Sequence, residues 1–471
     1  MNDLSFRMTS LPLSKTLSAL PQVSEAVAVP PAAKIVVLDD DPTGTQTVHS
    51  VPVLTTWEPL ELERALNDPG PCFFILTNSR AYPQDRACRI NHEIGGHLAQ
   101  ASRNSGCSFI VVSRGDSTLR GHYPAETDAL AEGLGVAWDG TLIIPAFFAG
   151  GRITIGDVHY VADVDRDTLI PVGETEFARD KSFGYRSSNL RAWVEEKTMG
   201  RVAAADVLSI SIEDLRVSGA RHVARKLLAH PRGCVVIVNA VNPSDLAILT
   251  QALADTEREG RRYLFRTAAD FVSAYAGISK RPLLTPEELT GSGCALGGLV
   301  VAGSYVGKTS AQLEALARIC PSIDRIEVQV DALLSEGQRP QEIARCSNLV
   351  DERLAAGQSV TLFTSRSLVV GRDSSENLSI GKTVSSSLVS VVRSLRTRPR
   401  WLIAKGGITS SDLATDALGI RRATVLGQAA PGVPVWLPGE ESKWPGLPYI
   451  IFPGNVGGVE TLARLAEALE K

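Results

Sequence analysis

The sequence has little that points to export, to a membrane or to a metal cluster. Its seven cysteines are scattered through 471 residues with no CxxC pair and no Cys/His cluster of zinc-binding spacing, which indicates buried thiols in a reducing compartment. No stretch approaches the ~18 consecutive apolar residues of a membrane span, and residues 1–33 lack the pattern of a signal peptide. These absences predict a cytoplasmic protein with no membrane partner.

An excess of either charge is also missing. The 48 Lys and Arg residues nearly balance the 52 Asp and Glu residues, which gives a net charge of -4. A protein that binds nucleic acid along its backbone needs a broad basic field, so we expect no nucleic-acid partner, although a local anion site stays open. The 44% hydrophobic and 21% charged composition is that of an ordinary folded protein rather than a disordered chain.

Short apolar runs alternate with stretches of helical spacing, which is typical of parallel sheets flanked by helices. At ~150 residues per domain the length favours more than one domain. We therefore predict an α/β fold with two lobes, each a mainly parallel sheet flanked by helices. The rhythm lapses in a stretch rich in Pro and Gly, which marks the boundary. The predicted parts are an N-terminal arm outside the core at 1–33, a first domain at 34–276, a linker at 277–298 and a second domain at 299–471.

The predicted strands are short and apolar, and helices should fill the gaps between them. Helices at 217–229 and 379–395 carry apolar residues at steps of three and four. The strands are predicted at 35–38, 51–55, 72–76, 109–113, 142–145, 207–210 and 235–239 in the first lobe, and at 299–302, 326–330, 360–363, 401–404, 424–426 and 449–452 in the second.

Polar clusters follow three strands of the first lobe, where an open α/β sheet collects its ligands. Segment 39–47 reads Asp-Asp-Asp-Pro-Thr-Gly-Thr-Gln-Thr, segment 77–80 reads Thr-Asn-Ser-Arg, and segment 113–122 reads Ser-Arg-Gly-Asp-Ser-Thr-Leu-Arg-Gly-His. A solvated turn, a surface arginine and a helix cap would explain each cluster taken singly. Together they indicate a pocket for a small, hydroxylated anion, with arginine for its carboxylate and Asp, Ser and Thr for its hydroxyls.

Glycine turns follow three strands of the second lobe and are suited to phosphate oxygens. Segment 302–309 resembles a P-loop with Ala at its first glycine, and the others are Gly-Gly-Ile-Thr at 406–409 and Pro-Gly-Asn-Val-Gly-Gly at 453–458. A P-loop enzyme also needs an Asp for magnesium at a neighbouring strand end, where this chain has Lys405. A P-loop centred on Lys308 and another kind of phosphate-binding turn are therefore both open.

These motifs resemble the four-carbon acid sugar kinase family. Asp-Asp-Pro-Thr-Gly, Asn-Ser-Arg, Gly-Asp-Ser-Thr-Leu-Arg-Gly and the later Gly-Gly and Gly-Asn turns occur in the family's order, from about Lys34 to the C-terminus. The resemblance implies an ATP-dependent kinase that uses Mg²⁺, with a sugar-acid lobe followed by a nucleotide lobe that meet at a shared cleft. The implied substrate contacts are Asp40, Arg80, Gly115, Asp116, Ser117 and Thr118. The implied nucleotide contacts are Ser304, Gly406, Gly407, Ile408, Thr409 and Gly454.

The chain departs from the family pattern at two turns. Ile408 stands where an acidic residue is usual, and Phe452-Pro453 stands where Lys-Ser is common. These departures leave the ligands of the metal unassigned. For the reaction we expect the substrate carboxylate on Arg80, with help from Arg114 or Arg120. One Asp takes the hydroxyl proton, with Asp116 as the first choice and Asp40 as the second.

Several alternatives stay open at this stage. The substrate is a four-carbon acid such as threonate, erythronate or an oxo-tetronate, or else a branched oxo-sugar acid such as 3-oxoisoapionate. A P-loop NTPase and a non-catalytic sensor of sugar acids are the rival functions. Whether the protein is a homodimer is not fixed by the sequence.

Overall fold

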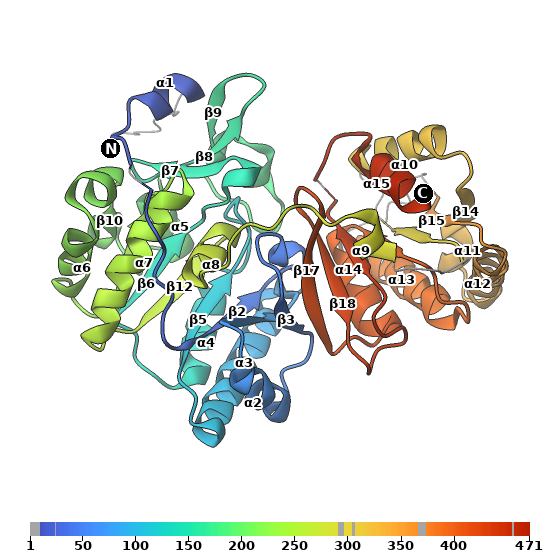
Figure 1. Ribbon diagram of the computed structural model, residues 1–471, viewed down its shortest axis with the longest axis horizontal. Coiled ribbons are helices and arrows are strands. Elements are labelled where there is room, and N and C mark those ends of the chain that lie inside the picture. The colour runs from blue at the N-terminus through green and yellow to red at the C-terminus, as the bar shows by residue number, and fades with distance from the viewer. Residues whose placement is uncertain (1–9, 24, 291–295, 304–306, 366–373, 455) are drawn as a thin grey trace. The chain divides into compact units, whose positions relative to one another are not determined.

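The computed structural model describes residues 10–23, 25–290, 296–303, 307–365, 374–454 and 456–471, and the chain forms two compact units (Figure 1). The first unit consists of residues up to Val48 together with Thr56–Lys280, and the second of His49–Thr55 together with Arg281–Lys471. Each contains a mainly parallel sheet flanked by helices, which confirms the predicted fold class. Among the described residues, no helix combines the length and apolar character needed to cross a membrane.

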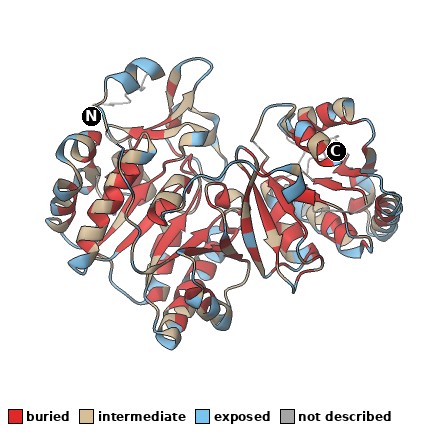
Figure 2. Cartoon of the chain, viewed as in Figure 1, coloured by how far each residue is buried: buried red, intermediate tan, exposed pale blue. Residues whose placement is uncertain are grey.

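The first unit is built on seven parallel strands in the order β10-β11-β6-β12-β5-β2-β4. Most of their residues are buried, as the continuous runs of Val, Ile, Leu and Phe require of strands covered on both faces (Figure 2). The strands are β2 (Lys34–Asp39), β4 (Cys72–Leu76), β5 (Phe109–Arg114), β6 (Gly140–Ile144), β10 (Leu208–Ile210), β11 (Cys234–Val238) and β12 (Tyr263–Thr267). Strand β12 was not among the predicted strands.

The helices of this unit pack in two groups, α2 to α4 and α6 to α8 (Figure 1). Their bounds are α2 (Pro59–Asn67), α3 (Gln84–Ser105), α4 (Ala125–Leu134), α5 (Leu190–Lys197), α6 (Ala220–Leu228), α7 (Pro243–Arg258) and α8 (Ala269–Tyr275). The helix predicted at 217–229 starts three residues late, because Gly219 has a φ of 78° and breaks the helical path. Residues Asp214–Ser218 form a separate turn of π-helix.

A small antiparallel sheet of order β1-β9-β8-β7 completes the first unit. It consists of β1 (Leu11–Pro12), β7 (Arg152–Ile155), β8 (Val158–Asp163) and β9 (Thr168–Pro171), and α1 (Leu13–Ser18) follows β1. Leu11 and Leu13 pack against the buried cluster under this sheet. The described part of the N-terminal arm is therefore attached to the unit, and the prediction that residues 1–33 lie outside the core was wrong there. A two-residue strand carries no periodicity from which to predict it.

The second unit holds a sheet of order β3-β17-β18-β19-β16-β13-β15-β14. Its last five strands are parallel, and β3, β17 and β18 run antiparallel to their neighbours. The strands are β3 (Val51–Leu54), β13 (Leu299–Ala302), β14 (Asp324–Val328), β15 (Val360–Thr364), β16 (Leu402–Lys405), β17 (Arg422–Ala430), β18 (Val433–Pro438) and β19 (Tyr449–Phe452). Residues 49–55 fall within the predicted first domain, 34–276, but β3 pairs with β17 and joins the second unit.

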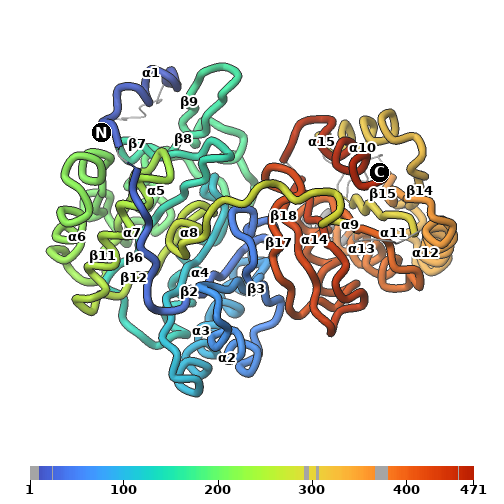
Figure 3. Tube along the Cα trace, viewed as in Figure 1, coloured from blue at the N-terminus to red at the C-terminus, as the bar shows by residue number. Residues whose placement is uncertain are grey.

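Helices α9, α10 and α15 contribute to a hydrophobic core cluster of the second unit, together with Trp401 and Phe452. The predicted linker also contributes, because Leu284 of the irregular stretch 278–285 and Leu289 of α9 are buried in that cluster (Figure 3). The helices are α9 (Pro286–Thr290), α10 (Gly307–Ile319), α11 (Val330–Leu334), α12 (Arg339–Ala355), α13 (Ser374–Ser394), α14 (Gly407–Asp412) and α15 (Thr461–Glu470).

Candidate functional site

The carboxyl ends of four neighbouring strands in the first unit lie at one edge of its sheet (Figure 1). Asp39 at the end of β2 is in register with Leu76 of β4 and with Arg114 of β5, and Arg114 is in register with Thr267 of β12. The three polar clusters predicted from the sequence therefore come together, as parallel strands in this order require.

Arg80 lies among the carboxylates of two of these clusters. Its guanidinium is 2.9 Å from Asp41, 3.3 Å from Asp40 and 3.4 Å from Asp116. Burial opposes its charge, but these three carboxylates raise its pKa, so it stays protonated. The arginine predicted to receive the substrate carboxylate is thus already paired within the protein, and its 16% exposure leaves a small part of it accessible.

Asp39 and Asp40 are buried and resist ionisation. Burial raises the pKa of Asp39 to about 7, although Arg114 lies 3.2 Å away and opposes the shift. Burial also raises the pKa of Asp40 to about 6, against the attraction of Arg80 and of Arg266, whose guanidinium is 3.9 Å away. Within the described part of the chain, neither carboxylate oxygen of Asp40 receives a hydrogen bond. Asp40 is therefore held by ion pairs with arginines, while its oxygens can still accept a hydrogen bond from a substrate hydroxyl.

Asp116 has the opposite environment. Burial again disfavours its charge, but Arg80, Arg120 and the Thr118 hydroxyl outweigh burial and hold the pKa of Asp116 well below its usual range. The Arg120 Nε is 2.7 Å from its Oδ2, and the Thr118 hydroxyl donates to the same oxygen. A carboxylate that accepts these bonds is a weak base and a firm anchor.

Two buried side chains hold the loop that carries Ser117 and Thr118. The His159 Nε2 lies 2.8 Å from the Ser117 carbonyl oxygen and must donate to it, so its Nδ1 accepts from the Thr154 hydroxyl at 2.9 Å. The Tyr185 hydroxyl donates to the Thr118 carbonyl at 2.6 Å. Burial lowers the pKa of His159 to about 4, so this ring is neutral at physiological pH.

Glycine is required at several points of this edge because the charged groups pass close to the backbone. A Cβ on Gly44 would lie 1.9 Å from the Asp39 Oδ2. A Cβ on Gly115 or on Gly121 would lie 2.4 Å or 2.7 Å from the Arg266 guanidinium. These contacts give a physical reason for the glycines of both motifs.

Sequence reasoning missed two charged residues of the cluster. Arg266 projects from β12, where its Nη1 is 3.0 Å from the Ser113 hydroxyl and 3.5 Å from Glu126 of α4. Glu126 is itself buried and accepts from the Ser79 hydroxyl. An arginine inside the apolar run Tyr-Leu-Phe-Arg-Thr was the available signal for the first, because a buried charge needs partners. Glu126 lies in a helix with no motif to mark it.

Strand ends also gather in the second unit. Lys405, the last residue of β16, is in register with Ala302 of β13 and Phe452 of β19, so the turns that follow these three strands are neighbours. A Cβ on Gly303 would lie 2.8 Å from the Thr409 hydroxyl. The predicted nucleotide residues Gly406, Gly407, Thr409 and Gly454 thus share one edge. Ile408 lies there too, with its side chain 59% exposed, and Ser304 lies outside the described residues.

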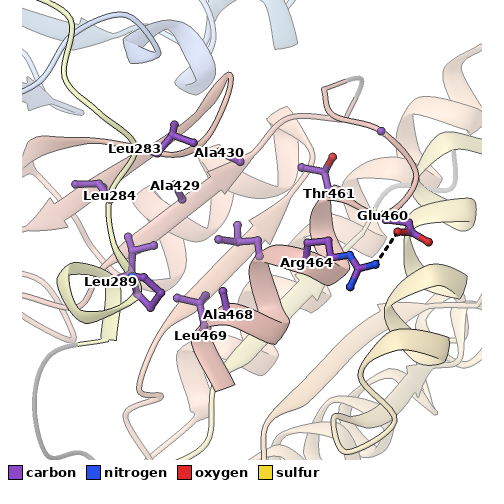
Figure 4. Close-up of a pocket in the computed structure, with 13 residues that line it drawn as sticks. Leu283, Leu284, Leu289, Ala429, Ala430, Glu460, Thr461, Arg464, Ala468 and Leu469 are labelled. Carbon is purple, nitrogen blue, oxygen red and sulfur yellow. Dashed lines mark hydrogen bonds and ion pairs between the residues drawn. The ribbon is translucent and has the colours of Figure 1, made fainter. Parts of the chain in front are cut away.

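An apolar pocket of about 450 Å³ lies elsewhere in the second unit (Figure 4). Leu283, Leu284 and Leu289 line one part of it, Ala429 and Ala430 of β17 another, and α15 the rest, with the Arg464–Glu460 ion pair among its lining. Of the described residues predicted to bind nucleotide, none lines it. The cation in its lining, Arg464, is paired with Glu460 and Glu467, so the pocket offers a phosphate no unpaired positive charge from that residue.

The acidic edge of the first unit consists of Asp39, Asp40, Asp41 and Asp116, and each of these carboxylates has an arginine within 3.4 Å. Among the described residues, no three His, Cys, Asp or Glu side chains are arranged to hold a metal ion. Carboxylates paired with Arg80, Arg114 and Arg120 do not fit a resident cation, because the arginines already supply the positive charge. Magnesium that uses few protein ligands and is held mainly by substrate phosphates is compatible with this arrangement.

Comparisons with known proteins agree with this two-part organisation. A family model described as a sugar-binding N-terminal domain matches residues 35–275, and one described as a nucleotide-binding C-terminal domain matches residues 299–462. The chain belongs to the four-carbon acid sugar kinase family, as the sequence resemblance predicted.

Two curated relatives have names in this family. The chain is 27% identical over 385 residues to a D-threonate kinase of Cupriavidus necator, covering 80% of each chain. It is 26% identical over 337 residues to a D-erythronate kinase of Heliobacterium modesticaldum, covering 68% of this chain and 69% of the relative.

Two solved structures share the fold. One, from Haemophilus influenzae, has a TM-score of 0.62 at 20% identity, covering 93% of this chain and 100% of that chain. The other, from Salmonella typhimurium LT2, has a TM-score of 0.66 at 19% identity, covering 92% of this chain and 98% of that chain.

Proposed function

We propose that this protein is a kinase that transfers the γ-phosphate of ATP to a hydroxyl of a four-carbon sugar acid such as threonate or erythronate. The observation that carries the proposal is the acidic edge of the first unit. There the buried Asp40 accepts no hydrogen bond from the residues that the structure describes, whereas Asp116 is strongly held. The names of the two relatives support the substrate class.

Asp40 is the general base in this proposal, and Asp116 is a substrate anchor. A base works best when its pKa lies near the working pH, and the pKa of Asp40, about 6, meets that condition while the lowered pKa of Asp116 does not. This reverses the order that the sequence alone favoured. Asp40 takes the proton of the attacking hydroxyl, and Arg80 and Arg266 stabilise the charges that remain.

The other residues of the acidic edge orient the sugar acid. Asp116, Ser117 and Thr118 bind its hydroxyls, and the backbone at Gly115 allows a close approach. Its carboxylate binds the exposed part of Arg80 with help from Arg120, which is 22% exposed, rather than from Arg114, which is 4% exposed. Buried arginines and carboxylates fix these groups before substrate arrives, so little reorganisation is needed in the reaction.

The nucleotide binds to the second unit, at the edge formed by Gly406, Gly407, Ile408, Thr409 and Gly454, together with Ser304. Bare backbone amides in such turns suit phosphate oxygens. Mg²⁺ bound with ATP would neutralise the charge that develops on the phosphoryl group. Because each carboxylate of the acidic edge is paired with an arginine, we assign the metal to the nucleotide phosphates.

The test is the release of ADP from Mg-ATP by the full-length protein. We expect a four-carbon acid, threonate or erythronate, to accelerate ADP release strongly and to appear as a phosphate ester in ³¹P NMR. A panel that includes oxo-tetronates and 3-oxoisoapionate distinguishes straight from branched acids. A P-loop NTPase would release ADP equally well without any acid, and a sensor would bind acid and nucleotide without turnover. Either result would remove the kinase proposal.

A further inference from the structure

Lys405 is fully buried at the end of β16, among the turns proposed to bind nucleotide. Its Nζ is 2.6 Å from the Pro453 carbonyl oxygen and 3.3 Å from that of Gly454. The Nζ also lies 4.6 Å from the centre of the ring of Phe452, the residue that pairs with Lys405 on the neighbouring strand β19. The side chain therefore crosses from one strand end to the turn that follows the next.

No carboxylate in the described ranges pairs with this ammonium. Within the described part of the chain no acidic group lies within 4 Å of it, whereas buried Arg216 has both oxygens of Asp245 at 2.7 and 2.9 Å. The neighbouring strands present uncharged Ala302 and Phe452. Two carbonyl dipoles compensate only in part for burying a charge.

The titratable groups around Lys405 do not supply the missing negative charge. Lys308 of α10 is itself a cation and repels it, and Asp412 of α14 accepts a hydrogen bond from Ser385 and does not act on Lys405. Burial, with the repulsion of Lys308, lowers the pKa of Lys405 to about 7. The free protein therefore holds a lysine that is only partly protonated at neutral pH.

The bonds of Lys405 also set the direction of a backbone amide. The Pro453 carbonyl points at the ammonium, and in a planar trans peptide the N–H of the next residue, Gly454, points the opposite way. That amide is directed away from the buried lysine. A lysine that holds this turn therefore fixes the orientation of a backbone donor among the turns where the nucleotide phosphates are proposed to bind.

We propose that Lys405 is the positioning residue for the phosphates of the bound nucleotide, and that nucleotide binding draws a proton onto it. The inference rests on the proposed function, because it takes the second unit as the nucleotide site. The phosphates supply the negative charge that the buried ammonium lacks, and the protonated ammonium in turn holds the 453–454 turn. The ligand class is a nucleoside di- or triphosphate, so adenosine, which has no phosphate, does not gain from Lys405.

Calorimetric titration of the full-length protein with Mg-ADP tests the inference. At pH 6.5 we expect Lys405→Met to weaken Mg-ADP binding at least tenfold and adenosine binding less than twofold. The matched control is Lys443→Met, which removes another lysine that bonds a main-chain carbonyl and lies 5.1 Å from the centre of an aromatic ring in the same unit. That variant should bind Mg-ADP as the wild type does. Equal loss of ADP and adenosine binding in Lys405→Met would overturn the inference.

Proton uptake gives a readout that a purely structural lysine would not move. At pH 8 a group with a pKa of about 7 is about nine-tenths neutral, so ADP binding to the wild type should take up close to one proton, measured in buffers of different ionisation enthalpy. The affinity should also fall as the pH rises above 7. Both effects should vanish in Lys405→Met, and their vanishing excludes titration of the nucleotide as the cause.

These measurements separate the inference from the proposed function. Mg-ADP binding by the wild type without proton uptake would overturn the role of Lys405 and leave the kinase proposal intact. A wild type that binds no nucleotide would overturn both. Circular dichroism shows whether Lys405→Met folds. If it does not fold, proton uptake by the wild type on ADP binding decides the question: uptake supports the inference, and no uptake overturns it.

Discussion

The two strand edges of this molecule use the same topology and opposite electrostatics. In the first unit Arg80 lies within 3.4 Å of Asp40 and Asp116, and Arg114 lies within 4.0 Å of Asp39 and Asp40. In the second unit the buried cation Lys405 lies among glycine turns, and no carboxylate of the described residues pairs with it. Parallel strands deliver whatever follows them to one edge, so the residues after each strand decide the chemistry there. A balanced cluster suits a hydroxylated acid and a proton transfer, and an unbalanced cation suits a polyphosphate.

Asp40→Asn should produce the largest effect, because it removes the proposed base from the balanced edge. We expect kcat to fall about 10³-fold, within the range usual for loss of a general base, with KM for the acid changed only a few-fold. Steady-state ADP release with threonate or erythronate measures both constants. If the two carboxylates had the reverse roles, Asp116→Asn would show this kcat loss and Asp40→Asn would not.

Arg80→Met should break the charge balance itself. Three carboxylates would lose the guanidinium that lies within 3.4 Å of each, and removing one partner of a buried ion pair costs about 3 kcal/mol or more. Denaturant unfolding of the full-length protein measures this loss of unfolding free energy. The Arg89→Met variant, whose ion pair with Asp85 is exposed, is the control and should be within about 0.5 kcal/mol of wild type.

Gly44→Ala should damage the same edge through packing rather than charge. The new Cβ would meet the Asp39 carboxylate at 1.9 Å, so that side chain must move, at a cost of about 1–3 kcal/mol. We expect lower kcat and lower stability in thermal unfolding. Gly70→Ala is the control, because the nearest atom to its Cβ is 3.9 Å away. Equal behaviour of the two variants would show that the Asp39 position does not matter.

The pH profile should show the base directly. Burial raises the pKa of Asp40 to about 6, and the base must be ionised to act, so kcat/KM should fall up to tenfold per pH unit below that value. Above pH 6 this group no longer limits the rate. If kcat/KM fell only below about pH 4, the base would be a carboxylate with an ordinary pKa instead.

His159→Leu should give the smallest effect. It removes the bond to the Ser117 carbonyl without touching a charged group, so we expect a rise in KM for the acid of about tenfold or less. Nucleotide affinity should not change. Because His159 is neutral above pH 4, the variant should keep the wild-type pH profile, which a catalytic histidine would not allow.

The sequence predicted the parts of each edge that lie directly after apolar strands. Segments 39–41, 77–80 and 113–122 were found in this way, because a strand end followed by charges is visible locally. Arg266 was missed because β12 itself was missed, and its partners are more than 100 residues away in sequence. Burial of Lys405 by the 453–454 turn depends on strand register, which no local pattern encodes.

The same limit explains the fold errors. Strand β3 was predicted at 51–55, but its pairing with β17, some 370 residues later, is a long-range choice. Strands β7 and β8 are short, and the Gly156-Asp157 turn between them, with φ of 56° and 64°, was the signal that could have revealed the hairpin. Phe452 pairs with Lys405 across β16 and β19, which is also a long-range contact.

The central claim is that the first unit binds the acid and the second unit binds the nucleotide. Its most direct test is a titration of both Asp116→Asn and Lys405→Met with threonate or erythronate and with Mg-ADP. We expect Asp116→Asn to weaken acid binding more than tenfold and to leave Mg-ADP binding unchanged, and Lys405→Met to do the reverse. Equal weakening of both ligands by either variant would contradict it.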